Sequence, residues 1–447
     1  MISTVLKHLL GRLVQFWHPP ERVCVDSRLI APGELFFALP GAVHDGHMFL
    51  EEAAKKGASG AVIRADYAGP VPHGLSVVRV DDPLRLLQDV AKRLVSASKG
   101  KVIAITGSIG KTTTKEFVRT ILGLHHTIFA THGNQNSEIG LPLSLINGLK
   151  GTEEWLVVEM GMTEAGHIRR LLEIAPPDIA LVTAVTLVHA ENFQSVQDIA
   201  RAKAEIFEHP KTLWNLYNGQ TGCGDVLSSI GKGIKRTFSV GGKTFWSLEV
   251  GGGCITIHEG GQPYQLPCPL FPSPHVYENL IAAIAAARTA NVSWEDVEQA
   301  MPLLRLPERR IEQKELGGIR FINDSYNACE LSTISALGVL AESSSGRRVA
   351  VLGQMRELGG FSKACHERVG EVALASSDAL YCLGQECEPM VRVWERAGRA
   401  VFWTCSFDDL VLKLKTDLQA ADVVLLKGSM SNGLWRILDH FVTEKAR

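Results

Sequence analysis

The sequence predicts an α/β protein of three domains: a small N-terminal α/β domain, a central domain with a parallel sheet and a β-rich excursion, and a C-terminal Rossmann-like α/β domain. Two observations support this prediction. The chain has 447 residues, and domains commonly hold on the order of 150 residues. Continuous runs of apolar, often β-branched residues, typical of strands buried on both faces, alternate with helical patterns such as the one at 280–288.

The first two domains are predicted from the following elements. The domain 1–82 combines a helical segment near 49–56 with short β-type runs at 22–25, 35–38, 61–63 and 76–80. The domain 83–312 is expected to begin its parallel sheet with the buried run 102–106 and to continue it with runs at 155–158 and 179–183. Between 219 and 274, Gly-rich turns and short alternating strands predict a β-rich excursion of this same domain.

A linker marked by Pro302 and Pro307 is expected before the third domain, 313–447. This domain is predicted to begin with a strand at 320–322. Two further buried runs, at 349–352 and 423–426, predict that it also contains a parallel sheet.

The composition excludes several classes of protein. The 46 Lys and Arg residues against 48 Asp and Glu leave a formal net charge of −2, so the chain lacks the basic footprint of a nucleic-acid binder. The nine cysteines include no Cys-x-x-Cys pair, which indicates reduced thiols and not a disulfide frame or a zinc site. No apolar run approaches the roughly 18 residues of a transmembrane helix. We expect a cytoplasmic protein without stable membrane insertion, and a monomer.

The N-terminal segment 1–16 predicts an amphipathic surface helix. Lys7 and Arg12 interrupt its apolar residues, and two prolines follow where a signal peptide would need small residues.

The strongest local signal is a Gly-rich loop directly after the run at 102–106. The segment Gly-Ser-Ile-Gly-Lys-Thr-Thr at 107–113 opens a predicted helix, so backbone N–H groups and the helix N-terminus can face a phosphate. Lys111 can reach the β and γ oxygens of a nucleotide, and the Thr112 hydroxyl can bind Mg²⁺. The general P-loop pattern has a Gly where this chain has Ile105, so the loop is a shortened variant. The alternative is a Gly-rich turn that binds nothing.

A carboxylate follows the run at 155–158. Glu159 stands at the carboxyl end of this predicted strand, where α/β sheets place ligand-binding residues. It can hold Mg²⁺ against phosphates. Such a residue is otherwise a helix cap or part of a loop salt bridge, but the P-loop upstream favours the metal.

A lysine occupies a core position on the predicted helix within 195–207. Ser195 and Asp198 have capping-box spacing, and Lys203 completes an otherwise apolar stripe. One explanation is that its long stem carries the ammonium to the surface. Burial would instead lower the lysine pKa and leave a neutral amine. Such an amine can add carbon dioxide and become a carbamate, which is an anionic metal ligand.

A histidine is expected at the same sheet edge as Glu159. His189 follows the run at 179–183, and a single histidine is usually structural. Together with Glu159 and a carbamoylated Lys203, however, it would complete a set of ligands for a second Mg²⁺.

These residues resemble the Mur ligases of bacterial cell-wall synthesis, and the resemblance covers nearly the whole chain. In family order it rests on the P-loop, Gly-Asn-Gln-Asn at 133–136 with Gly-Leu-Pro at 140–142, Val-Glu-Met-Gly at 158–161, His-Ala-Glu at 189–191 and Ala-Lys-Ala-Glu-Ile-Phe at 202–207. It identifies Lys203 as the carbamoylated lysine.

Later motifs are similar to those of the family member that adds D-alanyl-D-alanine to UDP-N-acetylmuramoyl-tripeptide. They are Asp-Ser-Tyr-Asn-Ala at 324–328 and Leu-Gly-Gln-Met-Arg-Glu-Leu-Gly at 352–359. The diaminopimelate-adding member shares Asp-Ser-Arg at 26–28 and Asp-Gly-His at 45–47, but its Asp-Asn-Pro-Arg motif is missing here. Three positions, Val276, Gln354 and Met430, depart from the family pattern. The last two lie in the domain expected to choose the acceptor.

The resemblance implies that domain 1–82 binds the UDP-sugar, that 83–312 binds ATP, and that 313–447 closes over ATP and the dipeptide. The implied catalytic residues are Lys111, Glu159, His189 and Lys203, and the implied metal ligands are Thr112, Glu159, His189 and Lys203. The implied ATP contacts are Gly107, Ser108, Gly110, Lys111, Thr112, Thr113, Asn279, Arg310 and Asp324. The implied contacts to the other substrates are Ser27, Arg28, Asp45, Gly46, His47, Asn134, Asn136 and Asn327.

The predicted reaction is ATP-dependent ligation of D-alanyl-D-alanine to the tripeptide through an acyl phosphate, with Mg²⁺ as cofactor. The near alternative is another amide ligase of the superfamily: a diaminopimelate- or lysine-adding enzyme, or a folylpolyglutamate synthase. The distant alternative is a nucleotide-binding module or a kinase. Whether His189 would hold metal or accept a proton stays open.

Overall fold

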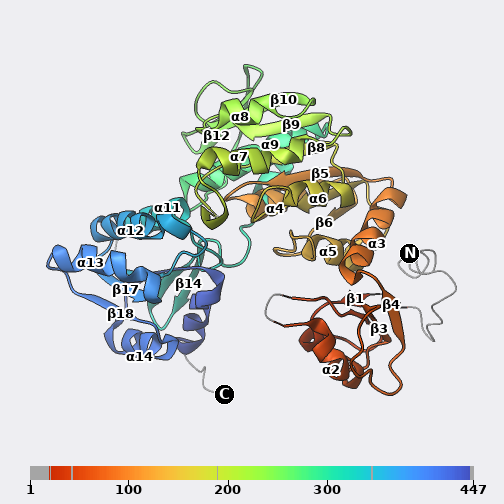
Figure 1. Ribbon diagram of the computed structural model, residues 1–447. Coiled ribbons are helices and arrows are strands. Elements are labelled where there is room, and N and C mark those ends of the chain that lie inside the picture. Colours follow the sequence, from red (N-terminus) through yellow and green to blue (C-terminus); the bar gives the residue numbers. More distant parts are fainter. Residues whose placement is uncertain (1–19, 21, 42–43, 189, 344–345, 443–447) are drawn as a thin grey trace, which may run out of the picture.

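The computed structural model describes residues 20, 22–41, 44–188, 190–343 and 346–442. Within these residues the chain forms sheets of four, nine and six strands, which belong to three α/β parts that follow one another along the sequence (Figure 1). The arrangement confirms the predicted α/β class. The segment 1–16 and His189, for which predictions were made, lie outside the described residues.

The N-terminal part is a parallel sheet whose strands lie in sequence order. Because neighbouring strand residues point to opposite faces, Phe36 packs in a cluster with helix α2 (Leu50–Lys55), while Leu35 and Phe37 pack with helix α3 (Pro83–Ala97). The N-terminal and central parts therefore share a core. The four predicted strands are confirmed as β1 (Val23–Cys24), β2 (Leu35–Phe37), β3 (Gly60–Arg64) and β4 (Val77–Val80).

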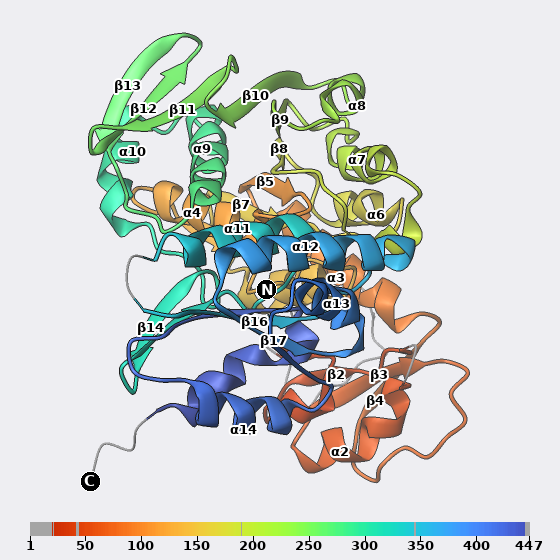
Figure 2. The ribbon, with the colours of Figure 1, turned by 90° about the vertical axis from the view of Figure 1, so that its left-hand side faces the viewer.

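The central part is a sheet of the order β13-β12-β11-β10-β9-β8-β5-β7-β6 with helices on both faces. In β5, Val102 and Ala104 contribute to the cluster on one face, and Ile103 and Ile105 contribute to the cluster on the other. Figure 2 shows α4 and α9 on one side of the strands and α6 and α7 on the other. The parallel strands are β5 (Lys101–Thr106), β6 (Ile128–Ala130), β7 (Trp155–Glu159), β8 (Ile179–Val182) and β9 (Trp214–Asn218). The helices are α4 (Lys111–Leu122), α5 (Gly140–Gly148), α6 (His167–Ile174), α7 (Val196–Ala204), α8 (Gly224–Ser229), α9 (Pro274–Thr289) and α10 (Trp294–Ala300).

The predicted β-rich excursion is confirmed, and it extends the central sheet. Strand β10 (Ile234–Val240) pairs in parallel with β9 and with β11 (Trp246–Gly251). Antiparallel pairing then adds β12 (Cys254–Glu259) and β13 (Gln262–Pro267).

The C-terminal part is a sheet of the order β14-β15-β19-β16-β17-β18, parallel except for the β14–β15 pair. The prediction that it begins with a strand at 320–322 was wrong: β14 comes first, and its mostly exposed, polar sequence carries no apolar signal. The strands are β14 (Glu312–Leu316), β15 (Ile319–Asn323), β16 (Arg348–Gly353), β17 (Ala379–Leu383), β18 (Val401–Thr404) and β19 (Val423–Lys427). The helices are α11 (Glu330–Ala341), α12 (Ser362–Ser376), α13 (Glu388–Arg396) and α14 (Phe407–Asp417).

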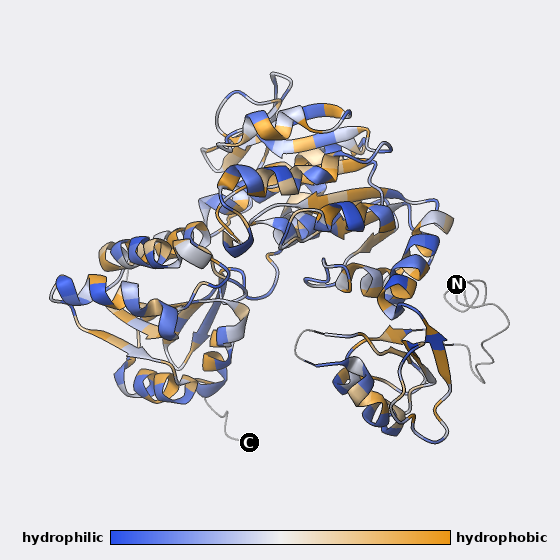
Figure 3. Cartoon of the chain, viewed as in Figure 1, coloured by the Kyte–Doolittle hydropathy of each residue, from blue (hydrophilic) through white to orange (hydrophobic). Residues whose placement is uncertain are grey.

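Both outer parts are fixed to the central one by direct contacts. The Val23 N–H donates to Asn147 Oδ1, and Asn147 Nδ2 donates to the Val23 carbonyl, each over 2.8 Å. On the other side, the Glu191 N–H donates to the Glu357 carbonyl over 3.3 Å. Apolar residues, orange in Figure 3, gather in the strands and on the inner faces of the helices. No helix in the described part of the chain has the length and apolar character needed to cross a membrane.

Candidate active site

The predicted P-loop connects strand β5 to helix α4 at the carboxyl edge of the central sheet. Its two glycines are required by the backbone, because φ is +151° at Gly107 and +82° at Gly110. A Cβ atom would also lie 1.9 Å from Thr183 Oγ1 at the first glycine and 2.0 Å from Asn279 Oδ1 at the second. No side chain among the described residues caps α4, so the first N–H groups of this helix can meet an anionic ligand.

The departure of this loop from the general pattern has a structural cause. Ile105 lies inside β5 and is fully buried in the core, so the strand occupies the position where other P-loops have their first glycine. Ser108 instead ties the loop to the segment after β8, since its N–H donates to the Ala184 carbonyl over 2.7 Å and its hydroxyl to the Thr186 carbonyl over 2.9 Å.

The ammonium of Lys111 lies over the loop. Its Nζ donates to the carbonyls of Gly107, at 2.8 Å, and Ser108, at 3.4 Å. Burial lowers the pKa of Lys111, and the nearby Glu159 carboxylate opposes this effect. The amine therefore lies against the backbone of the Gly-rich loop.

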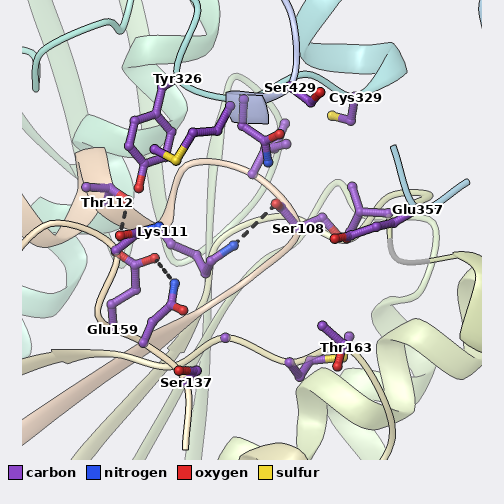
Figure 4. A pocket seen from close by; sticks show the side chains of 18 of the residues that line it. Ser108, Lys111, Thr112, Ser137, Glu159, Thr163, Tyr326, Cys329, Glu357 and Ser429 are labelled. Carbon is purple, nitrogen blue, oxygen red and sulfur yellow. Dashed lines mark hydrogen bonds between the residues drawn. The ribbon is translucent and has the colours of Figure 1, made fainter. Parts of the chain in front are cut away.

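Glu159, the last residue of β7, is the centre of a short hydrogen-bond network. Its Oε2 accepts from the Thr112 hydroxyl over 2.9 Å, and its Oε1 accepts from Asn136 Nδ2 over 2.7 Å (Figure 4). The carboxylate is almost completely buried. The hydroxyl and carboxylate are hard oxygen donors, which are the ligands that Mg²⁺ prefers, so the pair fits this ion.

Lys203 is buried, as the apolar stripe predicts. Helix α7 begins where expected, with the Ser195 hydroxyl accepting from the Asp198 N–H, and only 2% of Lys203 is exposed. The alternative in which its stem carries the ammonium to the surface is therefore wrong. Burial, and secondarily the charge of Lys111, places the pKa of Lys203 well below its ordinary value. The side chain lines the same cavity as Lys111 and Glu159.

This cavity has a volume of about 660 Å³ and lies between the central and C-terminal parts. The central part contributes the P-loop, Glu159 and Lys203, and also two of the predicted substrate contacts, Asn134 and Asn136. The C-terminal part contributes Tyr326 and the predicted contact Asn327. Figure 4 shows side chains of both parts facing one another across it.

A smaller cavity of about 90 Å³ lies beside the P-loop. It is lined by the predicted nucleotide contacts Gly110, Thr113, Asn279, Arg310 and Asp324. Since Gly110 and Arg310 line both cavities, the two are adjacent along the loop. Eight of the nine predicted ATP contacts therefore line one cavity or the other. The ninth, Gly107, accepts a hydrogen bond from Lys111 through its carbonyl.

The predicted contacts in the N-terminal part do not line either cavity. The Ser27 hydroxyl donates to Glu52 Oε2 over 2.7 Å, and the exposed Arg28 pairs with Asp26, Nη2 to Oδ2, over 2.7 Å. Asp45 Oδ1 accepts from the N–H of His47 over 3.0 Å.

The predicted Gly46 and His47 are tightly packed. A Cβ atom at Gly46 would lie 2.7 Å from the backbone of Leu39. His47 is buried, and its Nε2 accepts from the Arg64 N–H over 3.0 Å. These contacts order residues of the N-terminal part that lie outside the lining of both cavities.

Two buried lysines of this region carry no prediction from the sequence. Lys115 is fully buried in α4, and its Nζ donates to the carbonyls of Thr131, at 2.6 Å, and Gly133, at 3.0 Å. Lys427 is paired with Asp324, Nζ to Oδ2, over 2.8 Å. The sequence contained a signal for both lysines. Lys115 follows Lys111 by one helical turn, and Lys427 ends a strand that is otherwise apolar, so each cation stands among positions expected to be buried.

The chain is similar to known proteins over most of its length. The chain matches the family models described as Mur ligase family, catalytic domain, over 21–93, Mur ligase middle domain, over 105–287, and Mur ligase, glutamate ligase domain, over 309–430. The UDP-N-acetylmuramoyl-tripeptide--D-alanyl-D-alanine ligase of Synechocystis sp. is 32% identical, with 95% of this chain and 92% of the relative covered. The ligase of the same name from Treponema pallidum is 34% identical, with 93% of each chain covered.

A solved structure is similar over the same length. It is the MurF ligase from Thermotoga maritima in complex with ADP, which is 27% identical and superposes with a TM-score of 0.76 over 94% of this chain and 96% of its own.

Proposed function

Because this chain belongs to the Mur ligase family, we propose that it joins D-alanyl-D-alanine to UDP-N-acetylmuramoyl-tripeptide, with ATP consumed and ADP and phosphate released. The observation that supports this most directly is the cavity of about 660 Å³ in which the P-loop, Glu159 and Lys203 face residues of the C-terminal part. A P-loop alone would bind a nucleotide. The buried Lys203 beside it is explained by a ligase and not by a simple nucleotide-binding module.

A carboxylate does not condense with an amine in water without activation. ATP would therefore first phosphorylate the terminal carboxylate of the tripeptide. The dipeptide amine then attacks the acyl carbon, a tetrahedral intermediate forms, and phosphate leaves as the amide bond is completed. Placement of the reaction between two parts of the chain would exclude water from the acyl phosphate.

The central part supplies the electrostatic groups for the first step. Lys111, which lies over the P-loop, and the N–H groups at the start of α4 would face the phosphates, and such fixed groups usually contribute most to phosphoryl transfer. Thr112 and Glu159 would hold Mg²⁺, which when bound neutralises charge on the phosphate oxygens. His189 is proposed to act either as a metal ligand or as a base that accepts a proton.

Lys203 is proposed to act as a carbamate. Burial lowers its pKa and so favours the neutral amine; the neutral amine would add carbon dioxide, with an N–C bond formed and one proton released. The product is an anion in place of a buried cation. It would provide oxygen ligands for a second Mg²⁺ next to Glu159.

The three parts are proposed to divide the ligands. Residues 1–82 would bind the UDP-sugar, 83–312 would bind ATP, and 313–447 would close over ATP and the dipeptide. Ser27, Arg28 and the loop at Asp45 are the proposed contacts to the UDP-muramoyl group. The enzyme would act as a monomer in the cytoplasm, where ATP is available.

The test is a direct assay of the purified protein with ATP, Mg²⁺, UDP-N-acetylmuramoyl-tripeptide and D-alanyl-D-alanine. We expect phosphate release and a product whose mass equals that of the tripeptide plus the dipeptide, less one water. Turnover with a single amino acid on the UDP-muramoyl-dipeptide, and none with D-alanyl-D-alanine, would instead assign the chain to another amide ligase of the superfamily.

A further inference from the structure

The hydroxyl of Tyr326 is a buried polar group without a hydrogen-bond partner in the described part of the chain. A buried hydroxyl that lacks a partner loses its hydrogen bonds to water, at a cost of about 1–3 kcal/mol. Such groups are usually paired in native structures, and exceptions call for an explanation. Tyr326 lines the cavity that holds Lys111 and Glu159, so a substrate is the available partner.

The direction of the side chain supports this explanation. Figure 4 shows Tyr326 reaching down from the C-terminal part, with its hydroxyl end toward Thr112 and Glu159. Burial raises the pKa of Tyr326, and the negative charge of Glu159 adds to the effect against the opposing influence of Arg310 and Arg309. The phenol is therefore a hydrogen-bond donor at neutral pH.

A cation accompanies the phenol. The guanidinium of Arg310 lies over the Tyr326 ring, 4.2 Å from its centroid, and its Nε is also buried without a partner in the described residues. The ring face stabilises the cation in this position. Two unpaired donors of one stacked unit thus border the cavity that contains the P-loop.

The backbone on both sides of Tyr326 is held by contacts with Lys427. Buried Lys427 donates from Nζ to the carbonyls of Asp324, over 3.3 Å, and Asn327, over 2.5 Å, and pairs with the Asp324 carboxylate. The residues on both sides of Tyr326 are therefore held by one cation. This arrangement limits the positions that the phenol can adopt.

We propose that Tyr326 is a catalytic residue whose hydroxyl donates a hydrogen bond to the phosphoryl group as it passes from ATP to the substrate carboxylate. The bond between phosphorus and the ADP oxygen breaks, the bond to the carboxylate oxygen forms, and the phenolic proton stays on tyrosine throughout. Arg310, on the ring face, would meet the same group with positive charge. Because Tyr326 belongs to the C-terminal part and Lys111 to the central part, the complete set of donors requires both. The inference rests on the proposed ligase function.

The test is the variant Tyr326→Phe, which retains the ring under Arg310 and removes only the hydroxyl. Loss of one donor to a transition-state oxyanion typically costs 10²- to 10³-fold in rate, and we expect kcat to fall about 100-fold. The KM for ATP is expected to change less than about threefold, because the donor acts mainly in the transition state. ADP formation in a single turnover with the tripeptide, without dipeptide, should slow by the same factor as kcat.

Tyr264→Phe is the matched control, since Tyr264 of β13 stacks on Trp294 of α10, outside both cavities. A second variant, Tyr326→Leu, also removes the ring, and it should additionally raise the KM for ATP because Arg310 loses its stacking partner. A Tyr326→Phe enzyme with a wild-type kcat, or one altered only in KM, would overturn the inference while leaving the ligase function intact. Absence of ligation by the wild-type enzyme would instead refute the proposed function itself.

Discussion

The hydroxyl of Thr112 donates a hydrogen bond to the carboxylate of Glu159 over 2.9 Å, although 47 positions separate the two residues in the sequence. Thr112 lies in the first turn of the helix after β5, Glu159 ends β7, and the two strands are parallel neighbours. Their carboxyl ends therefore meet at one edge of the sheet. The contact brings together two oxygen donors of the kind that Mg²⁺ prefers, and in the proposed function they would hold this ion.

Replacement of Glu159 by Gln should impair metal use more than it impairs folding. The amide retains an oxygen to accept from Thr112 but loses the negative charge, so we expect kcat to fall at least about 100-fold and half-maximal activity to need more Mg²⁺. The measurement is ADP release during a Mg²⁺ titration. Glu154→Gln, at the exposed residue directly before the same strand, is the control. An unchanged Mg²⁺ requirement in Glu159→Gln would contradict the assignment.

Replacement of Lys203 by Ala should abolish most ligation, because it removes the proposed carbamate. Added short-chain carboxylates such as acetate should restore part of the activity by supplying oxygen ligands in the space that the side chain leaves. The assay is phosphate release with and without the carboxylate. Lys55→Ala, a change at an exposed lysine, should show neither loss nor rescue. Full activity of Lys203→Ala would refute the carbamate.

Gly110→Ala should weaken ATP binding through two effects. Its φ of +82° disfavours any side chain, at a cost of about 1–2 kcal/mol, and the new Cβ would lie 2.0 Å from Asn279 Oδ1. Gly74→Ala shares a positive φ, +88°, but has open space around the Cβ, so it isolates the cost of the backbone conformation. Calorimetric titration with ATP should show at least a tenfold weaker affinity for Gly110→Ala only, on the order of 1.4 kcal/mol. Equal ATP affinities would show that contact with Asn279 is unimportant.

Buried His366 should make the folded state less stable in mild acid. Its Nε2 accepts from the Met355 N–H over 3.1 Å, and burial lowers its pKa from the ordinary value of 6.5. Protonation thus favours the unfolded chain: the contribution of this residue is fully present above pH 6.5 and is lost as the pH falls toward the folded-state pKa. The loss is at most about 1.4 kcal/mol per pH unit.

Urea unfolding at pH 7.5 and pH 5.5 measures this effect of His366. His366→Gln cannot bind the proton, so its stability should change less between the two pH values than that of the wild type. If the free energy of unfolding of the wild type falls between pH 7.5 and pH 5.5 by no more than that of the variant, this histidine does not control acid sensitivity. Other titrating groups are common to both proteins and cancel in the comparison.

Much of the fold could be predicted from local sequence signals. Runs such as 102–106 and 155–158 consist of apolar residues because both faces of a central parallel strand are covered, and each is a strand in the structure. Strand β14 lacked this signal because it lies at an exposed edge and is polar. The β-rich excursion was predicted, but the sequence did not show that its strands extend the central sheet. That extension depends on the pairing of β10 with β9, which joins residues too far apart for a local pattern to reveal.

The candidate site was predictable to a similar extent. The P-loop, Glu159 and Lys203 have characteristic positions after strands or on a helix stripe, and the structure places them around one cavity. Tyr326 carried no separate signal, because an aromatic residue after a strand is ordinary. Its importance depends on a buried hydroxyl that has no partner within the described part of the chain and on a stacked arginine, and both depend on how the folded chain packs around Tyr326.

The sequence by itself determined the class of fold, the phosphate-binding loop and the presence of a lysine among buried positions, because these depend on periodicity and on residues within one turn or strand of each other. Only the tertiary structure decided that Lys203 is buried beside Lys111 and not directed to the surface, and that Tyr326 of the C-terminal part faces Thr112 and Glu159 of the central part. The physical reason is that burial and long-range pairing are properties of packed elements: a side chain loses water, and with it its ordinary pKa and hydrogen bonds, only when other parts of the chain cover it.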